Sequence, residues 1–437
     1  MRKDWAEIEL GEAGKIVSGG TPKTKVPEYW GGEIAWITPA DLSGYSSKYI
    51  SKGRKSITSL GLENSSARLM PKNSVLFSSR APIGYVAIAN NDLATNQGFK
   101  SLVPYPAVNS NYVYWYLKYA KQIAVENASG TTFKEISATA FSKLPFKLAP
   151  IPEQRAIVAK IEQLFSELDN GIANLTAAKD KLEIYRQAVL KKAFEGGLTD
   201  TKITKRSLSD FVALVTKGSS PKWQGFSYIN DSSQLLFITS ENVREGYIDL
   251  EKKKYLPLGF NEVQKRSMLK KGDILFNIVG ASIGRAAIYN LEAICNVNQA
   301  VAIIRLREDL SNVYLNYYLN SEMAKHEYLK KRVDVARANL SLKDVNGIKI
   351  PYCSYEKQLL ITEEIESRLS HCDNILSNIE EGLEKSEALR QSILKQAFEG
   401  KLLSETELEA CRNEPDWEPA EKLLKRIKNT KIELKEA

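Results

Sequence analysis

Few residues in this chain could do chemistry, and they are scattered. The string GASIG at 280–284 has the Gly-x-Ser-x-Gly spacing of a nucleophile elbow, a strained turn that exposes a serine. A serine nucleophile needs a base, and only two histidines are present. We expect His326 in an amphipathic helix and His371 in a long helix, so neither is placed to serve Ser282. The string is therefore interpreted as a tight turn between strands.

Metal and cofactor motifs are also missing from the sequence. There is no Gly-x-x-x-x-Gly-Lys-Ser/Thr loop, no Gly-x-Gly-x-x-Gly after a strand and no His-Glu-x-x-His. The Asn/Asp-Pro-Pro-aromatic motif of amino-methyltransferases is absent as well. The cysteines form no Cys-x-x-Cys pair and are expected to be free thiols of a cytoplasmic protein. We predict no catalysis, no metal and no cofactor; the cysteines are Cys295, Cys353, Cys372 and Cys411.

Neither a membrane span nor a signal peptide is expected, since no apolar run reaches the required length. The net charge of +8 is unevenly distributed. Residues 1–152 carry +7 and residues 200–356 carry +6, whereas residues 153–199 are neutral and residues 357–437 carry −5. Two basic segments separated by neutral or acidic ones predict two surfaces for a polyanion.

The segments between the basic ones are copies of one another. Residues 153–198 and 357–402 align without a gap, and both contain Ala-Phe-Glu-Gly near the end. In the first copy, apolar or small residues recur at alternating steps of four and three, which is the heptad pattern of a helix that packs lengthwise against another. We predict two long helices; the seam of the first consists of Ile157, Ile161, Leu164, Leu168, Gly171, Leu175, Ala178, Leu182, Tyr185 and Val189.

The two basic segments are also copies of each other. Residues 10–22 match 208–221, and residues 36–42 match 237–243. Each copy has short strand-like runs between turn-forming residues, followed by an expected amphipathic helix at 112–125 or 313–331. The fold class is therefore α+β, with two repeated domains separated by two long helices. We place domain 1 at 1–152, the first helix at 153–199, domain 2 at 200–356, the second helix at 357–402 and a tail at 403–437.

The repeat also predicts geometry. If a pseudo-two-fold relates the two copies, the long helices must run antiparallel. One chain would then resemble a symmetric dimer with two non-identical basic domains.

The order and duplication of these motifs resemble the specificity (S) subunit of type I restriction-modification enzymes. The resemblance covers essentially the whole chain. Its motifs are Ser18-Gly-Gly-Thr-Pro22, Pro150-Ile-Pro-Glu-Gln-Arg-Ala-Ile157 opening the first long helix, and the Ala-Phe-Glu-Gly blocks closing both helices. The second copy departs in places, for example with Ser219-Ser-Pro221 in place of Gly-Gly-Thr-Pro.

This resemblance implies a DNA-recognition subunit without catalytic activity. Each domain would be a target-recognition domain that reads one half of a bipartite, asymmetric site in double-stranded DNA. The helices would set the spacing between the halves and dock two methyltransferase (M) subunits, and restriction (R) subunits would join for cleavage. S-adenosylmethionine would belong to M and ATP to R, so this chain would hold neither.

We expect phosphate contacts to supply most of the affinity and a few side chains at base edges to choose the sequence. Two other classes stay open: a divergent methyltransferase or hydrolase, and a repeat scaffold that binds protein or RNA. Candidate DNA-binding residues are the basic or aromatic side chains near expected turns: Lys23, Lys25, Arg80 and Lys134 in domain 1, and Lys222, Trp223, Arg285, Arg337 and Lys343 in domain 2.

Overall fold

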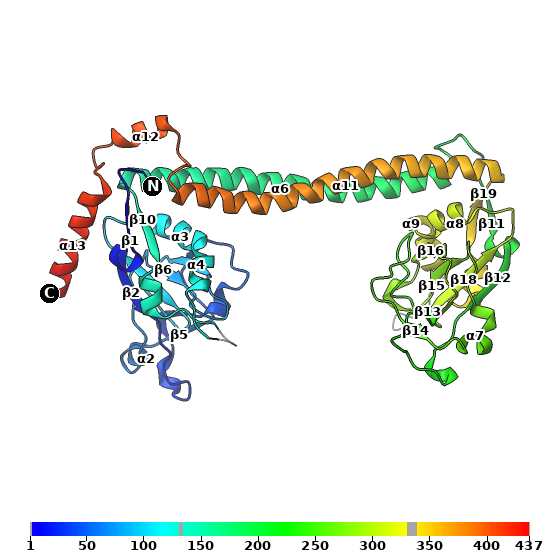
Figure 1. Cartoon of the computed structure of the whole chain (residues 1–437), viewed down its shortest axis with the longest axis horizontal. Helices are drawn as coiled ribbons and strands as arrows, with labels where there is room; N and C mark the ends of the chain where they lie inside the picture. The colour runs from blue at the N-terminus through cyan, green and yellow to red at the C-terminus, as the bar shows by residue number, and fades with distance from the viewer. Residues whose placement is uncertain (1, 131–133, 330–338, 437) are drawn as a thin grey trace. The chain divides into compact units, whose positions relative to one another are not determined.

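The computed structural model describes residues 2–130, 134–329 and 339–436 (Figure 1). The chain divides into two compact units, residues 1–174 with 382–437 (unit 1) and residues 175–381 (unit 2). Each unit combines one α+β domain with the start of one long helix and the end of the other. None of the helices in the described ranges is apolar enough over sufficient length to cross a bilayer.

The described residues of unit 1 form three sheets. A five-stranded sheet has the order β2-β9-β6-β7-β4, a three-stranded sheet has the order β5-β3-β8, and β1 pairs with β10. The pairs β4–β7 and β3–β8 are parallel, and the other pairs are antiparallel. The strands are β1 (Ala6–Glu9), β2 (Gly14–Ser18), β3 (Trp30–Ile37), β4 (Tyr49–Ile50), β5 (Lys55–Ile57), β6 (Val75–Phe77), β7 (Val86–Ala89), β8 (Leu93–Thr95), β9 (Lys100–Pro104) and β10 (Pro145–Leu148).

Unit 2 repeats this plan. Its sheets have the orders β12-β18-β15-β16, β14-β13-β17 and β11-β19, and β13–β17, like β3–β8 in unit 1, is parallel. The predicted duplication of an α+β domain is therefore confirmed. The strands are β11 (Thr204–Ser207), β12 (Val212–Lys217), β13 (Leu235–Ile238), β14 (Tyr255–Leu256), β15 (Ile274–Asn277), β16 (Ala286–Ile288), β17 (Cys295–Val297), β18 (Val301–Leu306) and β19 (Lys349–Tyr352).

The amphipathic helix predicted in each domain is in fact two shorter helices. In unit 2 the break falls at Asn320, whose side-chain amide donates to the carbonyls of Asn316 and Ala286, and at Ser321, whose hydroxyl accepts from the amide of Ala324. Such side chains compete with helical hydrogen bonds and end a helix. The short helices are α1 (Leu10–Ala13), α2 (Ser59–Glu63), α3 (Ser110–Tyr119), α4 (Lys121–Glu126), α5 (Ala138–Ser142), α7 (Phe260–Val263), α8 (Asn312–Leu319), α9 (Glu322–Leu329) and α10 (Leu342–Asn346).

The long helices are α6 (Ile151–Phe194) and α11 (Tyr355–Phe398). Both end at the phenylalanine of Ala-Phe-Glu-Gly, two residues before the glycine, and Gly196 and Gly400 have φ of 84° and 74°. A left-handed residue at this place closes a helix, and glycine adopts it without strain. In each unit one helix segment pairs with the other through equivalent groups: Arg390 binds Asp169 in unit 1, and Arg186 binds Asp373 in unit 2.

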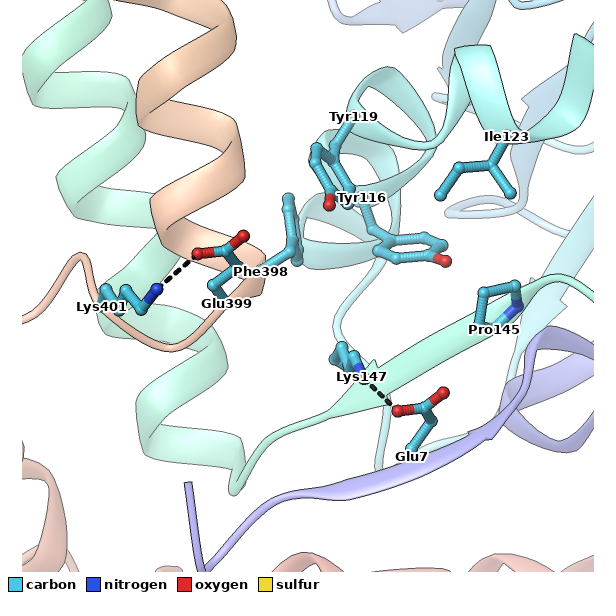
Figure 2. A pocket seen from close by; sticks show the side chains of 9 residues that line it. All are labelled: Glu7, Tyr116, Tyr119, Ile123, Pro145, Lys147, Phe398, Glu399 and Lys401. Carbon is cyan, nitrogen blue, oxygen red and sulfur yellow. Dashed lines mark hydrogen bonds and ion pairs between the residues drawn. The ribbon is translucent and has the colours of Figure 1, made fainter. Parts of the chain in front are cut away.

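A buried phenylalanine at the end of each long helix anchors it to a domain. Phe398 packs against Tyr112 and Tyr116, with ring centroids 5.2 and 5.3 Å away. Figure 2 shows its neighbourhood, a cavity of about 410 Å³ bordered by the ion pairs Glu7–Lys147 and Glu399–Lys401.

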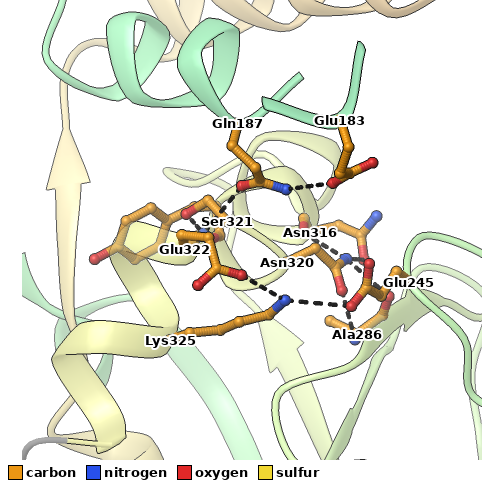
Figure 3. A network of polar contacts seen from close by, with 10 residues as sticks. Glu183, Gln187, Glu245, Ala286, Asn316, Asn320, Ser321, Glu322 and Lys325 are labelled. Atoms are coloured by element: carbon orange, nitrogen blue, oxygen red, sulfur yellow. Dashed lines mark hydrogen bonds and ion pairs between the residues drawn. The ribbon is translucent and has the colours of Figure 1, made fainter. Parts of the chain in front are cut away.

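In unit 2, Phe194 meets two tyrosines in the same way, Tyr314 at 5.2 Å and Tyr318 at 5.3 Å. Gln187, on the same helix, links α6 to the domain, and an ion-pair network lies next to this contact (Figure 3). The Gln187 side-chain oxygen accepts from the backbone amide of Glu322, and Lys325 bridges Glu322 and Glu245 at 3.0 and 3.3 Å.

The tail forms α12 (Glu405–Arg412) and α13 (Ala420–Glu436) and belongs to unit 1. Its apolar side chains, among them Leu408 and Leu423, are buried in the core of that unit. Arg155 near the start of α6 binds Asp416 at 2.7 Å and also Glu414, and Lys160 binds Glu407 at 3.0 Å.

Candidate nucleic-acid interface

In domain 1, a turn after β6 gathers basic side chains around a cavity of about 610 Å³. The turn supplies Arg80 with Pro82 and Ile83, α4 supplies Lys121, and Lys134 comes from the segment that pairs with the turn. Glu135 binds Arg80 at 3.3 Å and Lys100 at 3.4 Å. The cavity thus offers cationic groups beside an apolar surface, a combination suited to a phosphate and its sugar.

A glycine permits this arrangement. Gly84 has φ of +101°, and a Cβ built there would lie 2.5 Å from the Cγ of Lys121. The lysine stem therefore passes over the turn at a place that only glycine leaves open.

In domain 2, the equivalent turn contains the GASIG string. Ser282 ends a 3-10 turn, η6 (Gly280–Ser282), between β15 and β16, so the interpretation as a turn is confirmed. Arg285 leaves this turn and lines a cavity of about 370 Å³ together with Arg244, Lys252 and acidic groups. Arg244 binds Asp249 through two nitrogens, at 3.0 and 3.2 Å. A backbone hydrogen bond from Glu251 and the Arg244 guanidinium lower the pKa of Asp249.

The remaining candidates lie elsewhere on the two domains. Lys23 and Lys25 are exposed in the loop between β2 and β3, and neither lines the domain 1 cavity. Lys222 and Trp223 lie in the 3-10 turn η4 (Lys222–Gln224), where the Trp223 side chain is 77% exposed. An indole this exposed offers a face for stacking.

Lys343 is exposed on α10. Arg337 lies outside the described residues.

Two of the predicted residues, Arg80 and Lys134, line the same cavity in domain 1. In domain 2, Arg285 lines a cavity with Arg244 and Lys252, which the sequence analysis did not name as candidates. Lys121 was missed in the same way. These side chains come from segments far apart in sequence, and only the fold brings them to one turn. The turn that recurs in both copies of the domain was the one feature of the sequence that pointed to these two cavities.

Across the residues that the structure describes, no group of three or more His, Cys, Asp and Glu side chains could hold a metal ion. All four cysteines are free and buried, and burial raises the pKa of the Cys295 thiol.

Comparisons with known proteins agree with the duplicated plan. The family model of the type I restriction modification DNA specificity domain matches residues 2–177 and again 202–386. The specificity subunit of the type I restriction enzyme MjaIX from Methanocaldococcus jannaschii is 41% identical over 172 residues, 38% of this chain and 39% of that protein. The EcoBI specificity subunit from Escherichia coli is 29% identical over 302 residues, 64% of this chain and 63% of the relative. The chain thus spans less than two thirds of the length of each.

Two solved structures share the fold. A chain from work on complex assembly and conformational transition of the type I R-M system has a TM-score of 0.69 at 18% identity, with 92% of this chain and 99% of that chain covered. The HsdS subunit from Thermoanaerobacter tengcongensis has a TM-score of 0.57 at 19% identity, with 92% and 98% covered. Two matches to the family model, which together span most of the sequence, show that this chain belongs to the type I restriction-modification specificity family.

Proposed function

We propose that this chain is the non-catalytic DNA-recognition subunit of a type I restriction-modification complex, and that each domain reads one half of a bipartite, asymmetric site in double-stranded DNA. One observation carries the proposal. The two domains share a sheet plan and a turn that contains an Ile-Gly pair, yet the arginine differs in position: Arg80 precedes this pair in domain 1, and Arg285 follows it in domain 2. A common framework with different contacts suits two domains that read different sequences.

The basic side chains divide into two expected roles. Lysines such as Lys121 and Lys134 act as point charges on phosphates and position the duplex. Arginines are suited to bidentate contacts with guanine, so Arg80, Arg244 and Arg285 are the better candidates for base readout. Two of these are held by carboxylates in the free protein, Arg80 by Glu135 and Arg244 by Asp249, and would exchange that partner for DNA.

The long helices would set the distance between the half-sites and dock two M subunits. Several apolar side chains on these helices face solvent in the chain alone, among them Ile184 (70% exposed), Leu359 (47%) and Leu360 (48%). Exposed apolar groups on a helix pair are typical of a surface that a partner covers. S-adenosylmethionine would bind M and ATP would bind R. The division into two recognition domains, two spacer helices and a tail is part of this proposal.

The test is co-expression with a neighbouring methyltransferase gene, followed by single-molecule methylation sequencing of the host DNA. We expect one bipartite motif with a methylated adenine in each half. A stable complex with M that binds DNA without regard to sequence would favour the scaffold alternative. Methyl transfer by the isolated chain would revive the enzyme alternative.

A further inference from the structure

Two glutamines in the first turns of the long helices make matching sets of hydrogen bonds. Gln154 in α6 is fully buried. Its side-chain nitrogen donates to the carbonyls of Ala149, directly after β10, and Ala107, in the turn before α3, at 2.8 and 3.3 Å. Its side-chain oxygen accepts from the backbone amide of Asn109 at 2.8 Å, and Asn109 is the N-cap of α3.

Gln358 in α11 repeats every one of these contacts in unit 2. It is also fully buried. Its nitrogen donates to the carbonyls of Cys353 and Asp309 at 2.9 and 3.3 Å. Its oxygen accepts from the amide of Ser311 at 2.8 Å, and Ser311 is the N-cap of α8.

Each amide therefore ties three segments together: the long helix, the strand that leads into it and the start of the domain helix. Glutamine suits this place because its amide has two donor hydrogens and one acceptor oxygen, and all are used. A glutamate has no donors, and a methionine of similar volume has neither donors nor a comparable acceptor. Hydrogen bonds depend on angle, whereas apolar packing alone tolerates small rotations.

We propose that Gln154 and Gln358 are positioning residues that fix the angle between each domain and its long helix, and so confine DNA recognition to one spacing of the half-sites. The effect on half-site spacing rests on the proposed function. The effect on the angle between domain and helix does not depend on it. Loss of either amide would let the domain rock on its helix while both base-reading surfaces stay intact.

The two glutamines are not equally supported. In unit 1 a second buried tie lies beside the amide, because the Trp5 indole donates to the Glu153 carboxylate at 2.7 Å. The residue equivalent to Glu153 in unit 2 is Lys357, which is exposed. Domain 2 therefore depends on its glutamine more than domain 1 does.

The structural part is tested on the full chain without DNA. Spin labels at Lys72→Cys and Ser166→Cys, both exposed and both in unit 1, report the distance from domain 1 to α6, and the native cysteines are all buried. Gln154→Met should broaden the distance distribution, whereas the control Gln163→Met, an exposed glutamine on the same helix, should not. If Gln154→Met does not fold, Gln154→Asn replaces it, because the shorter amide cannot reach all three partners. An unchanged distribution would overturn the proposal.

The DNA part uses the complex with M and methylation sequencing. In Gln358→Met, methylation at sites whose spacer differs by one base pair should rise about tenfold relative to correct sites, which corresponds to roughly 1.4 kcal/mol. Gln154→Met should give a smaller rise, and Gln391→Met, an exposed control on α11, none. Both half-sites should stay the same. A change in a half-site, or a uniform loss without relaxed spacing, would contradict the positioning role. If the unaltered chain gave no bipartite motif, the proposed function would be wrong. The spin-label distances would still show whether Gln154 fixes the angle between domain 1 and α6.

Discussion

The two units share one plan and differ at the place where a long helix begins. In unit 1 the start of α6 is covered by the chain's own tail, and Pro152 and Glu153 are buried. In unit 2 the matching residues of α11, Glu356 and Lys357, are exposed. The duplicated sequence therefore produces two domains on the same plan but two unequal helix starts.

The difference extends to the side chains themselves. Where α6 has Arg155, which binds acidic groups of the tail, α11 has Leu359, and where α6 has Ala156, α11 has Leu360. Polar or small residues thus face the tail in unit 1, whereas leucines face solvent in unit 2. A helix start that lacks its own cover and carries leucine is suited to a partner, so the comparison teaches that a repeat can keep its fold and still offer two different surfaces.

The largest expected effect comes from shortening both helices together. Four residues are removed from α6 between Asp169 and Lys179, and four from α11 between Glu380 and Arg390, so that the ion pairs of each unit are retained. The lost rise is about 6 Å, close to that of two base pairs at about 3.4 Å each. Methylation sequencing with M should show both half-sites unchanged and a spacer shorter by about two base pairs. The same spacer as before would show that the helices do not set it.

Removing the aromatic anchors tests whether the units are independent. Phe398→Ala should destabilise unit 1 and Phe194→Ala unit 2, each by about 3–5 kcal/mol, because each deletes a fully buried ring. Hydrogen exchange followed by mass spectrometry, with peptides assigned to each unit, measures the stability of unit 1 and of unit 2 separately. Faster exchange in both units from either single variant would mean that they unfold as one body.

The exposed leucines should matter for partner binding. Leu359→Glu with Leu360→Glu should weaken the affinity for M about tenfold, or roughly 1.4 kcal/mol, as measured by calorimetry. The matched control is Leu258→Glu with Val263→Glu, which also adds two carboxylates at exposed apolar side chains of domain 2. An equal loss of affinity for M in the control would mean that added surface charge causes the effect. The exposed leucines of α11 would then not be a binding surface for M.

Lys121, one of the side chains that the sequence analysis missed, should act as a phosphate contact. Lys121→Ala should lower the affinity of the M complex for specific and unrelated DNA alike, and should reduce the slope of log affinity against log salt by about one unit. Lys181→Ala, an exposed lysine on α6, serves as the control. A loss confined to the specific site would instead make Lys121 a base-reading residue.

The smallest expected effect is a pH dependence of the tail. A hydrogen bond from Arg155 lowers the pKa of Asp416, and hydrogen bonds from the backbone of Ser404 and from Lys160 lower that of Glu407. Carboxylates with a lowered pKa stabilise the folded state above their unfolded pKa, and this support is lost as the pH falls through the folded value. Proteolysis of the tail should therefore be slow at neutral pH and faster below about pH 4. Equal rates would show that the tail is held by its apolar side chains alone.

Much of the architecture could be predicted because the sequence contains two copies of each domain and each long helix. Heptad spacing in the first copy and its aligned repeat predicted two long helices, which are present as α6 and α11. The split of each amphipathic helix was missed, since the hydrogen bonds of Asn320 reach a strand that no local pattern reveals.

The site could be predicted only in part. Arg80 and Lys134 were found from a repeated turn, but Lys121 and Arg244 reach their cavities through tertiary structure. The docking of the tail was not foreseen either, because the groups that hold it, such as Arg155 and Asp416, are 261 residues apart.

The division of the chain into units has a consequence for protein synthesis. Unit 2 is one continuous stretch, residues 175–381, whereas unit 1 needs both ends of the chain. During translation the segment that contains domain 1 emerges first, yet Phe398 and the tail that complete its core are made last. Domains usually fold in order from the N-terminus as the ribosome releases them. Here the domain made first is the last to be finished, and a chain cut short before Phe398 would release a complete second unit beside an open first one.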